Sequence, residues 1–250
     1  SLPPAYLHTS LVSHSLDRRM KLLIRRPPAS RPAPVLYLLH GAGRDELTYL
    51  QLAGLGRVPA DVLDSFWIVM PEGHRGWYLD SPQVPTSCYE AHLLEVMDWV
   101  EKRFPVSREQ AGRAIGGFSM GGFGAFRLAA RYPERFCATS SIIGTLDIAQ
   151  WYPDYHQIGR LLGAEKSAWQ AENPRELAGG LSDVALWLCT GTESFDRPQN
   201  EAFVSRLVAL GIPHEYHMFG GRHDIELVSR CVPAQLAFHR NVFAGAVRRQ

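Results

Sequence analysis

Short continuous apolar runs recur along the chain, and longer segments with helical spacing lie between them. A run of this kind is typical of a parallel strand that is covered on both faces. The runs that predict such strands are Val35–Leu39, Phe66–Met70, Ala114–Phe118, Ala138–Ile143, Val184–Cys189 and Glu215–Phe219. Two opening strands, Leu7–Leu16 and Arg19–Arg26, precede them and are expected to pair antiparallel.

Helices are predicted in the segments between these strands. Ser87-x-x-Glu90 has the pattern of a capping box, in which the serine side chain accepts a hydrogen bond from the backbone N–H of Glu90. Asn173-Pro174 has the pattern of an N-cap followed by proline in the first turn. Further helices are expected at Gly121–Arg131, at Gln199–Leu210, which stops before Gly211, and at Pro233–Val247.

The alternation of strands and helices predicts a single α/β domain over residues 1–250, with a mostly parallel central sheet and helices on both faces. Such sheets carry their sites at the carboxyl ends of the strands. Residues 144–183 form a long excursion between two strands and contain Trp151, Tyr152, Tyr155 and Trp169. Connections of this length are usually functional or structured. The excursion is therefore expected to form either a helical lid over the site or a satellite core.

Charge and cysteine usage argue against several classes of function. The formal net charge is +1 and no long basic run is present, so a nucleic-acid partner is not expected. No apolar stretch is long enough to cross a bilayer. The four cysteines are far apart and include no C-x-x-C pair, which favours free thiols and no zinc site. Free thiols, and a start without a signal-peptide pattern, lead us to expect a cytoplasmic protein. Whether it forms a homo-oligomer stays open.

Gly117-Phe118-Ser119-Met120-Gly121 is a G-x-S-x-G sequence between an apolar strand and a helix of small residues. A serine on a sharp strand-to-helix turn has a strained backbone, and glycines two positions away avoid clashes there. The alternative is a glycine-rich turn that contains a serine by chance. A phosphate-binding loop does not fit, because no Gly-Lys-Ser/Thr occurs. The context favours Ser119 as a nucleophile, and the pattern resembles the nucleophile elbow of the α/β-hydrolase fold.

The resemblance to α/β-hydrolases implies the chain order serine, acid, histidine. Of the ten histidines, those that follow late enough are His214, His217, His223 and His239. His214 and His217 flank or occupy a predicted strand, and His239 lies in the last predicted helix. His223 lies in a loop after the last strand, so it is the expected base.

The same resemblance implies an oxyanion hole made of two backbone N–H groups. One comes from the loop that follows the Val35–Leu39 strand, which reads His40-Gly41-Ala42-Gly43. The other comes from the residue after the nucleophile. The donors are therefore assigned to Ala42 and Met120.

Further motifs make the chain resemble the esterase D–like branch of the α/β-hydrolases, which includes S-formylglutathione hydrolases, tributyrin and feruloyl esterases, and mycolyltransferases. The matching segments are Leu38-Leu39-His40-Gly41, Gly76-Trp77-Tyr78-x-Asp80-Ser81, Cys88-Tyr89-Glu90, Gly117–Gly122, Pro133-Glu134-x-Phe136, Asn173-Pro174, Gly191-Thr192-Glu193, Asn200 and Gly221-x-His223-Asp224. The resemblance implies that His40, Gly41, Trp77 and Tyr78 contact the substrate.

The triad acid is expected in the loop after the Val184–Cys189 strand. Many relatives place an aspartate where this chain has Ser194, and a hydroxyl carries no charge to stabilise an imidazolium, so replacing Ser194 is expected to be nearly silent. Asp196 and Glu193 are both candidates. We favour Asp196, the family's residue type, although Arg197 could hold it as a surface ion pair. Asp224, beside the base, is expected to be a surface or capping carboxylate.

Together these features predict a serine carboxylesterase that hydrolyses esters or thioesters of small acyl groups through an acyl-enzyme on Ser119. Its expected partner is a small-molecule ester, and neither a metal nor an organic cofactor is required. Two alternatives stay open. An acyltransferase would use the same triad and pass the acyl group to an alcohol. A catalytically inactive binding protein with a hydrolase fold would explain the displaced acid.

Overall fold

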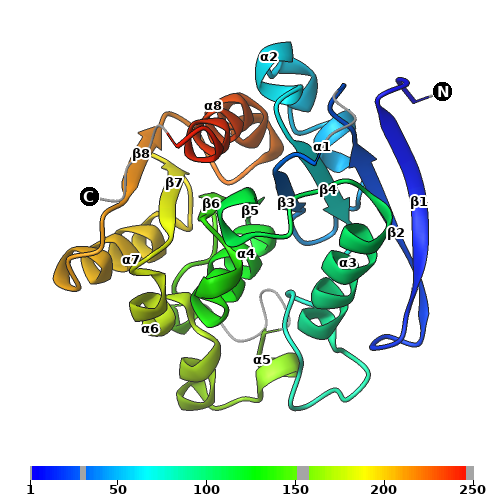
Figure 1. Ribbon diagram of the computed structural model, residues 1–250. Helices are drawn as coiled ribbons and strands as arrows, with labels where there is room; N and C mark the ends of the chain where they lie inside the picture. Colours follow the sequence, from blue (N-terminus) through cyan, green and yellow to red (C-terminus); the bar gives the residue numbers. More distant parts are fainter. Residues whose placement is uncertain (1, 29–31, 151–157, 246–250) are drawn as a thin grey trace.

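An eight-stranded sheet runs through the middle of the computed structural model, which describes residues 2–28, 32–150 and 158–245 (Figure 1). The strand order is β1-β2-β4-β3-β5-β6-β7-β8. The strands are β1 Tyr6–Ser13, β2 Arg18–Arg25, β3 Val35–Leu39, β4 Trp67–Pro71, β5 Arg113–Phe118, β6 Ala138–Ile142, β7 Ala185–Gly191 and β8 Glu215–Phe219. The pairs β1–β2 and β2–β4 are antiparallel, and all the others are parallel, which confirms the predicted sheet.

Helices connect the strands and lie on both faces of the sheet. The α-helices are α1 Thr48–Gln51, α2 Ala60–Leu63, α3 Tyr89–Arg103, α4 Met120–Arg131, α5 Ile158–Leu162, α6 Pro174–Leu177, α7 Arg197–Ala209 and α8 Ile225–Phe243. Short 3-10 turns are Leu55–Arg57, Gln110–Gly112, Pro133–Arg135, Ile148–Gln150, Lys166–Glu172 and Ala178–Leu181.

Two hydrophobic clusters divide the core, one on each face of the sheet. On one face, apolar side chains of α3, α4 and α7, such as Val96, Phe123 and Phe203, pack against the strands. On the other face, α1, α2 and α8 supply side chains such as Tyr49 and Leu236 (Figure 1). Because both faces are covered, every residue of β3, β4 and β5 is buried, which explains their continuous apolar runs.

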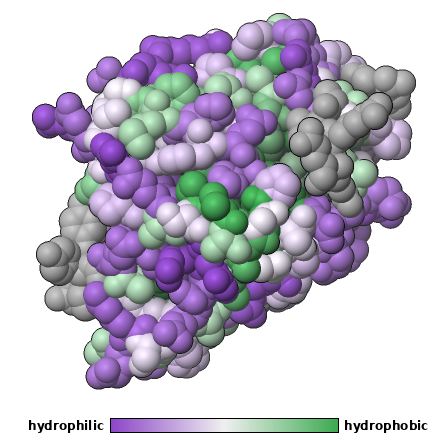
Figure 2. Space-filling model, turned by 90° about the vertical axis from the view of Figure 1, so that its left-hand side faces the viewer, coloured by the Kyte–Doolittle hydropathy of each residue, from purple (hydrophilic) through white to green (hydrophobic). Residues whose placement is uncertain are grey.

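β8 ends the sheet and is more exposed than the central strands. Figure 2 views the molecule from this side and shows hydrophobic residues gathered near the middle of a largely hydrophilic face. The large apolar side chains exposed on β8 and at the end of α7 are Met218, Val208 and Leu210. The edge of the sheet is thus partly apolar.

The parallel strands β3 to β8 all end at the same edge of the sheet. β5 lies between β3 and β6, and β7 lies beside β8. The segments that follow β3, β5, β7 and β8 therefore meet at this edge, and they are the segments that carry the predicted site residues.

The predicted capping box at the start of α3 is wrong. The N-cap of α3 is Cys88, and its side chain makes no capping hydrogen bond. Instead, Asp80 Oδ1 accepts hydrogen bonds from the backbone N–H groups of Glu90 and Ala91, both at 3.1 Å. Asp80 reaches the helix because a bridge to Cys88 folds its loop back. The Glu90 side chain is buried and pairs with Arg127 instead of returning to the cap.

The last helix begins at Ile225, well before the predicted start at Pro233, which lies inside it. The Asp224 side chain caps it by accepting a hydrogen bond from Leu227 N at 2.9 Å, so Asp224 has its expected capping role. A proline inside a helix leaves the carbonyl four residues earlier without its usual donor, here that of Ser229. Gly54 packs closely there, since an added Cβ would lie 2.3 Å from Ser229 O.

The excursion at 144–183 contains α5, α6 and short 3-10 turns. Trp169 is fully buried and its Nε1 donates to Gly163 O at 2.9 Å, which fits the satellite-core alternative. Asn173 is the N-cap residue of α6, as predicted, but its side chain bonds Ile148 N and Asp147. Trp151, Tyr152 and Tyr155 lie outside the described residues.

Candidate active site

Ser119 sits on the sharp turn between β5 and α4, with φ 54° and ψ −119°. The two glycines of the motif make this turn possible. A Cβ on Gly117 would lie 2.3 Å from the Gly121 carbonyl carbon, and a Cβ on Gly121 would lie 2.1 Å from Leu39 O. Any larger residue at either position would have to displace backbone atoms. The turn therefore fixes the serine at the amino end of α4, where the helix dipole favours a developing negative charge.

His223 links the serine to a carboxylate. Its Nε2 lies 2.9 Å from Ser119 Oγ, and its Nδ1 lies 2.7 Å from Asp196 Oδ1. Because a carboxylate only accepts, Nδ1 carries the proton, and Nε2 is left as the acceptor that faces the hydroxyl. The structure thus brings together the three side chains that the sequence nominated.

Backbone hydrogen bonds hold the loops of Asp196 and His223 against each other. Thr192 N donates to Phe219 O at 2.8 Å, and Glu193 N donates to Gly221 O at 2.9 Å. These bonds extend the pairing of β7 with β8 beyond the sheet. They set the spacing between the acid and the histidine.

Asp196 is completely buried and its carboxylate is saturated with donors. Oδ2 accepts from Thr190 Oγ1 at 2.5 Å and from Asn200 Nδ2 at 2.8 Å. Oδ1 accepts from the Ser194 hydroxyl as well as from His223. A buried charge with this many donors keeps a fixed orientation.

The alternative acid points away from this arrangement. The Glu193 side chain is 67% exposed and pairs with Arg222 at 3.3 Å. Arg197 pairs with Glu201 at 2.7 Å, so the surface ion pair considered for Asp196 does not form.

The three other histidines considered as the base make their contacts away from Ser119. His217 is exposed beside Glu215, and His214 Nδ1 contacts Ile212 O. His239 is buried in α8 against Ser140, and burial lowers its pKa from 6.5 to about 3.

The loop after β3 packs against the nucleophile. A Cβ on Gly41 would lie 2.6 Å from Phe118 Cε2 and 3.3 Å from Ser119 Cβ, so only glycine allows this approach. Within the described ranges, no hydrogen bond uses the backbone N–H of Ala42 or Met120. No acceptor in these ranges therefore occupies either predicted donor.

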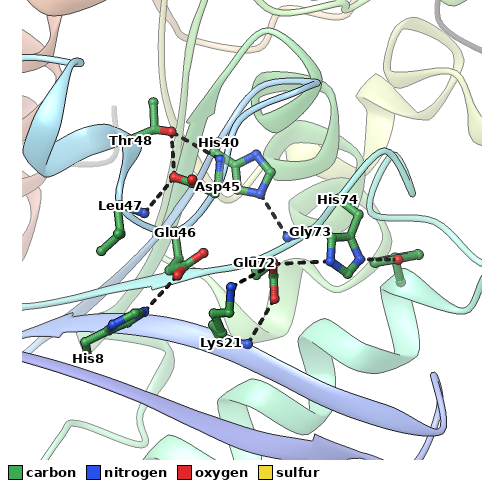
Figure 3. A network of polar contacts seen from close by, with 11 residues as sticks. His8, Lys21, His40, Asp45, Glu46, Leu47, Thr48, Glu72, Gly73 and His74 are labelled. Carbon is green, nitrogen blue, oxygen red and sulfur yellow. Dashed lines mark hydrogen bonds and ion pairs between the residues drawn. The ribbon is translucent and has the colours of Figure 1, made fainter.

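His40 anchors this loop from inside (Figure 3). Its Nδ1 lies 2.8 Å from Gly41 O, and its Nε2 accepts from Gly73 N at 2.9 Å. This pattern fits only the neutral imidazole with the proton on Nδ1. Burial lowers the pKa of His40 from 6.5 to about 4, which keeps the ring neutral near pH 7.

The expectation that His40, Trp77 and Tyr78 contact the substrate needs correction, because their side chains are buried. Trp77 packs edge-on against Phe123, with ring centroids 5.4 Å apart. The Tyr78 hydroxyl donates to His40 O at 2.9 Å, so it holds the loop after β3. Gly41 is buried too and contributes close packing.

Sequence reasoning missed several residues that shape the site. Phe195 stacks on the His223 imidazole, with centroids 4.1 Å apart and planes at 28°, and remains 45% exposed. Thr190 and Ser194 were not recognised as donors to the acid. Asn200 was noted only as a family match, although its position one helical turn after Asp196 gave a usable signal.

Neither a metal site nor a membrane span is found among residues 2–28, 32–150 and 158–245. No group of three or more His, Cys, Asp or Glu side chains in these ranges is arranged to hold a metal ion. No helix in them combines the length and the apolar character that a bilayer crossing needs.

Known proteins resemble the chain over most of its length. A family model described as "Putative esterase" matches residues 13–229. Esterase Rv1288 of Mycobacterium tuberculosis (strain ATCC 25618 / H37Rv) is 32% identical over 226 residues, which cover 78% of this chain and 49% of that protein. The chain therefore spans about half the length of this curated relative.

Two solved structures resemble almost the whole chain. The serine hydrolase FphF of Staphylococcus aureus is 20% identical, with a TM-score of 0.85 and coverage of 96% of this chain and 100% of that one. An S-formylglutathione hydrolase from Agrobacterium tumefaciens is 19% identical, with a TM-score of 0.85 and coverage of 97% and 98%. These likenesses confirm the predicted α/β-hydrolase fold.

Proposed function

Because the chain belongs to the putative esterase family, whose model matches residues 13–229, we propose that it is a serine carboxylesterase that forms an acyl-enzyme on Ser119 and prefers small acyl groups. The observation that carries this proposal is the 2.9 Å contact between Ser119 Oγ and His223 Nε2 on the strand-to-helix turn. The preference for small acyl groups rests on the resemblance to small-acyl esterases alone.

In the first half of the reaction, Ser119 Oγ attacks the carbonyl carbon of the ester while His223 Nε2 takes its proton. The imidazolium that forms is stabilised by the buried Asp196 carboxylate. The backbone N–H groups of Ala42 and Met120 bind the oxyanion of the tetrahedral intermediate. His223 then gives the proton to the leaving alcohol as the ester bond breaks, and the acyl group remains on Ser119.

In the second half, His223 removes a proton from a water molecule, which attacks the acyl-enzyme. A second tetrahedral intermediate collapses, the acid leaves, and the proton returns to Ser119 Oγ. None of these steps requires a metal ion or an organic cofactor.

The geometry also bears on the inactive binding protein considered above. That alternative was motivated by the displaced acid. With Asp196 Oδ1 only 2.7 Å from His223 Nδ1, the displacement gives no reason to expect inactivity. The acyltransferase alternative differs only in the acceptor, and no contact in the described residues favours it.

A panel of p-nitrophenyl esters tests the proposal. The protein should hydrolyse the acetate and butyrate faster than the octanoate, and Ser119→Ala should abolish turnover while its circular dichroism spectrum stays unchanged. Products should be acid and alcohol, including when an added alcohol is present. Turnover retained in Ser119→Ala would reject the mechanism, and faster octanoate hydrolysis would reject the small-acyl preference.

A further inference from the structure

The loops after β3 and β4 meet beside the nucleophile. Gly73 N donates to His40 Nε2 at 2.9 Å, so the start of one loop is bonded to the start of the other (Figure 3). The Tyr78 hydroxyl bonds His40 O from further along the loop after β4. Gly41 packs closely against Ser119, so the loop after β3 connects the loop after β4 with the nucleophile.

Arg75 projects from the loop after β4 onto the loop that carries Ala42. An added Cβ on Gly43 would lie 2.8 Å from Arg75 Nη2, so the guanidinium rests directly against Gly43. Gly43 has φ +74°, a conformation that disfavours other residues. The glycine thus gives the loop its shape and leaves space for the arginine. Gly43 lies two residues after Gly41, which packs against Ser119, so Arg75 contacts the same loop that contacts the nucleophile.

The Arg75 guanidinium is exposed and has no counter-ion in the part of the chain that the structure describes. The carboxylates on the two loops already have partners. Glu46 pairs with His8, and Glu72 pairs with His74 (Figure 3). Asp45 is engaged in hydrogen bonds at the start of α1. Among the described residues, no carboxylate therefore competes with an outside anion for the Arg75 guanidinium.

The backbone that carries Arg75 is held firmly. His74, Trp77 and Tyr78 all have positive φ, and Trp77 and Tyr78 are anchored in the core. A Cβ on Gly76 would lie 1.9 Å from Tyr89 Cδ2, and the Tyr89 hydroxyl lies 2.8 Å from His74 Nδ1. Packing thus fixes the residues on both sides of Arg75. The start of its side chain is fixed, and only the side-chain torsions remain free.

We propose that Arg75 forms an anion subsite, so that the preferred esters carry a carboxylate or phosphate group that its guanidinium binds. The inference rests on the proposed esterase function and adds a substrate class to it. A guanidinium presents paired N–H donors that match the oxygens of a carboxylate or phosphate. Arg44 is a second exposed arginine, on the loop after β3. The anion belongs either to the acyl group or to the leaving alcohol.

Two pairs of chromogenic esters distinguish these sources. The p-nitrophenyl monoester of adipic acid is compared with p-nitrophenyl hexanoate for the acyl side. The acetate ester of 5-hydroxy-2-nitrobenzoic acid is compared with p-nitrophenyl acetate for the alcohol side. For at least one pair, kcat/KM of the charged ester should exceed that of its neutral match by about tenfold at low salt. Salt at about 0.5 M should reduce this ratio, because the guanidinium is exposed.

In Arg75→Gln, the ratio of kcat/KM for the charged ester to kcat/KM for its neutral match should fall to about one. In Arg75→Lys, the ratio should fall only partly, because the lysine keeps the charge but not the paired donors. Arg57→Gln, at an exposed arginine on another segment, should keep it fully. A ratio near one in the unmodified protein for both pairs would overturn the inference and leave the esterase proposal standing. A ratio that persists in Arg75→Gln would overturn it as well. If no ester is turned over at all, the esterase proposal fails and the inference fails with it.

Discussion

The Ser194 hydroxyl donates a hydrogen bond to Asp196 Oδ1, the same carboxylate oxygen that accepts from His223 Nδ1. Ser194 stands at the position where the family resemblance implied an aspartate. The carboxylate lies two residues later, directly before α7, and Ser194 is one of its donors. The contact between the acid and the histidine is thus intact although the acid is displaced from the expected position.

Asp196→Asn should lower kcat by about a thousandfold or more, because an amide at this position neither fixes the Nδ1–H tautomer of His223 nor stabilises its charged form. Steady-state hydrolysis of p-nitrophenyl acetate measures the change. Glu193→Gln, on the same loop but exposed beside Arg222, is the matched control and should be nearly silent. If Glu193→Gln collapses the rate and Asp196→Asn does not, the acid has been misassigned.

Ser194→Ala should lower kcat by about tenfold, in contrast to the silent effect expected from the sequence alone. A hydrogen bond to a charged group is worth about 1.5–3 kcal/mol, and the three other donors to Asp196 limit the loss. The matched control is Ser205→Ala, at an exposed serine of α7 that bonds Glu201 O. An unchanged kcat in Ser194→Ala would show that this contact does not assist the acid.

The protein should lose stability as the pH falls from about 6.5 towards 4. Burial lowers the pKa of His40 and of His92 from 6.5 to about 4, and that of His239 to about 3. Above pH 6.5 these rings are neutral in both states. Below pH 6.5 each of these rings binds a proton in the unfolded chain but not in the folded chain. Each ring therefore lowers the free energy of unfolding by about 1.4 kcal/mol per pH unit in this window.

The variant His40→Asn, which does not titrate at this position, tests the His40 contribution. Between pH 6.5 and 4.5 its free energy of unfolding, measured in urea, should fall less steeply than that of the unmodified protein. The difference between the two slopes should correspond to about one bound proton. The variant Ser205→Ala, at an exposed serine of α7 that carries no titratable group, should keep the slope of the unmodified protein. An unchanged slope in His40→Asn would mean that His40 is not held neutral in the folded state.

The strands were predictable because each carries its own signal. β3, β4 and β5 are covered on both faces, and a continuous apolar run is the direct consequence. The elbow was predictable for a similar reason, since Gly117 and Gly121 are needed by contacts that any side chain would break. A feature that depends on residues close by in the chain can therefore be predicted from the sequence.

Other features depend on residues far away in the chain. Asp80 caps α3 because of a bridge that no local pattern reveals, and Pro233 suggested a helix start although Asp224 begins the helix earlier. Trp77 and Tyr78 looked like pocket residues, but tertiary packing turns both rings inward. The choice between Asp196 and Glu193 was likewise open, because the contacts that distinguish the two come from Thr190, Asn200 and Arg222.

The central claim, that Ser119 is the nucleophile, is tested most directly by labelling with a fluorophosphonate and locating the adduct by peptide mass spectrometry. The account predicts one adduct per chain, on the peptide that contains Ser119. It also predicts that Ser119→Ala is unlabelled, and that Asp196→Asn is labelled much more slowly because the histidine activates the serine poorly. An adduct on another residue, or labelling of Ser119→Ala at the rate of the unmodified protein, would contradict the account.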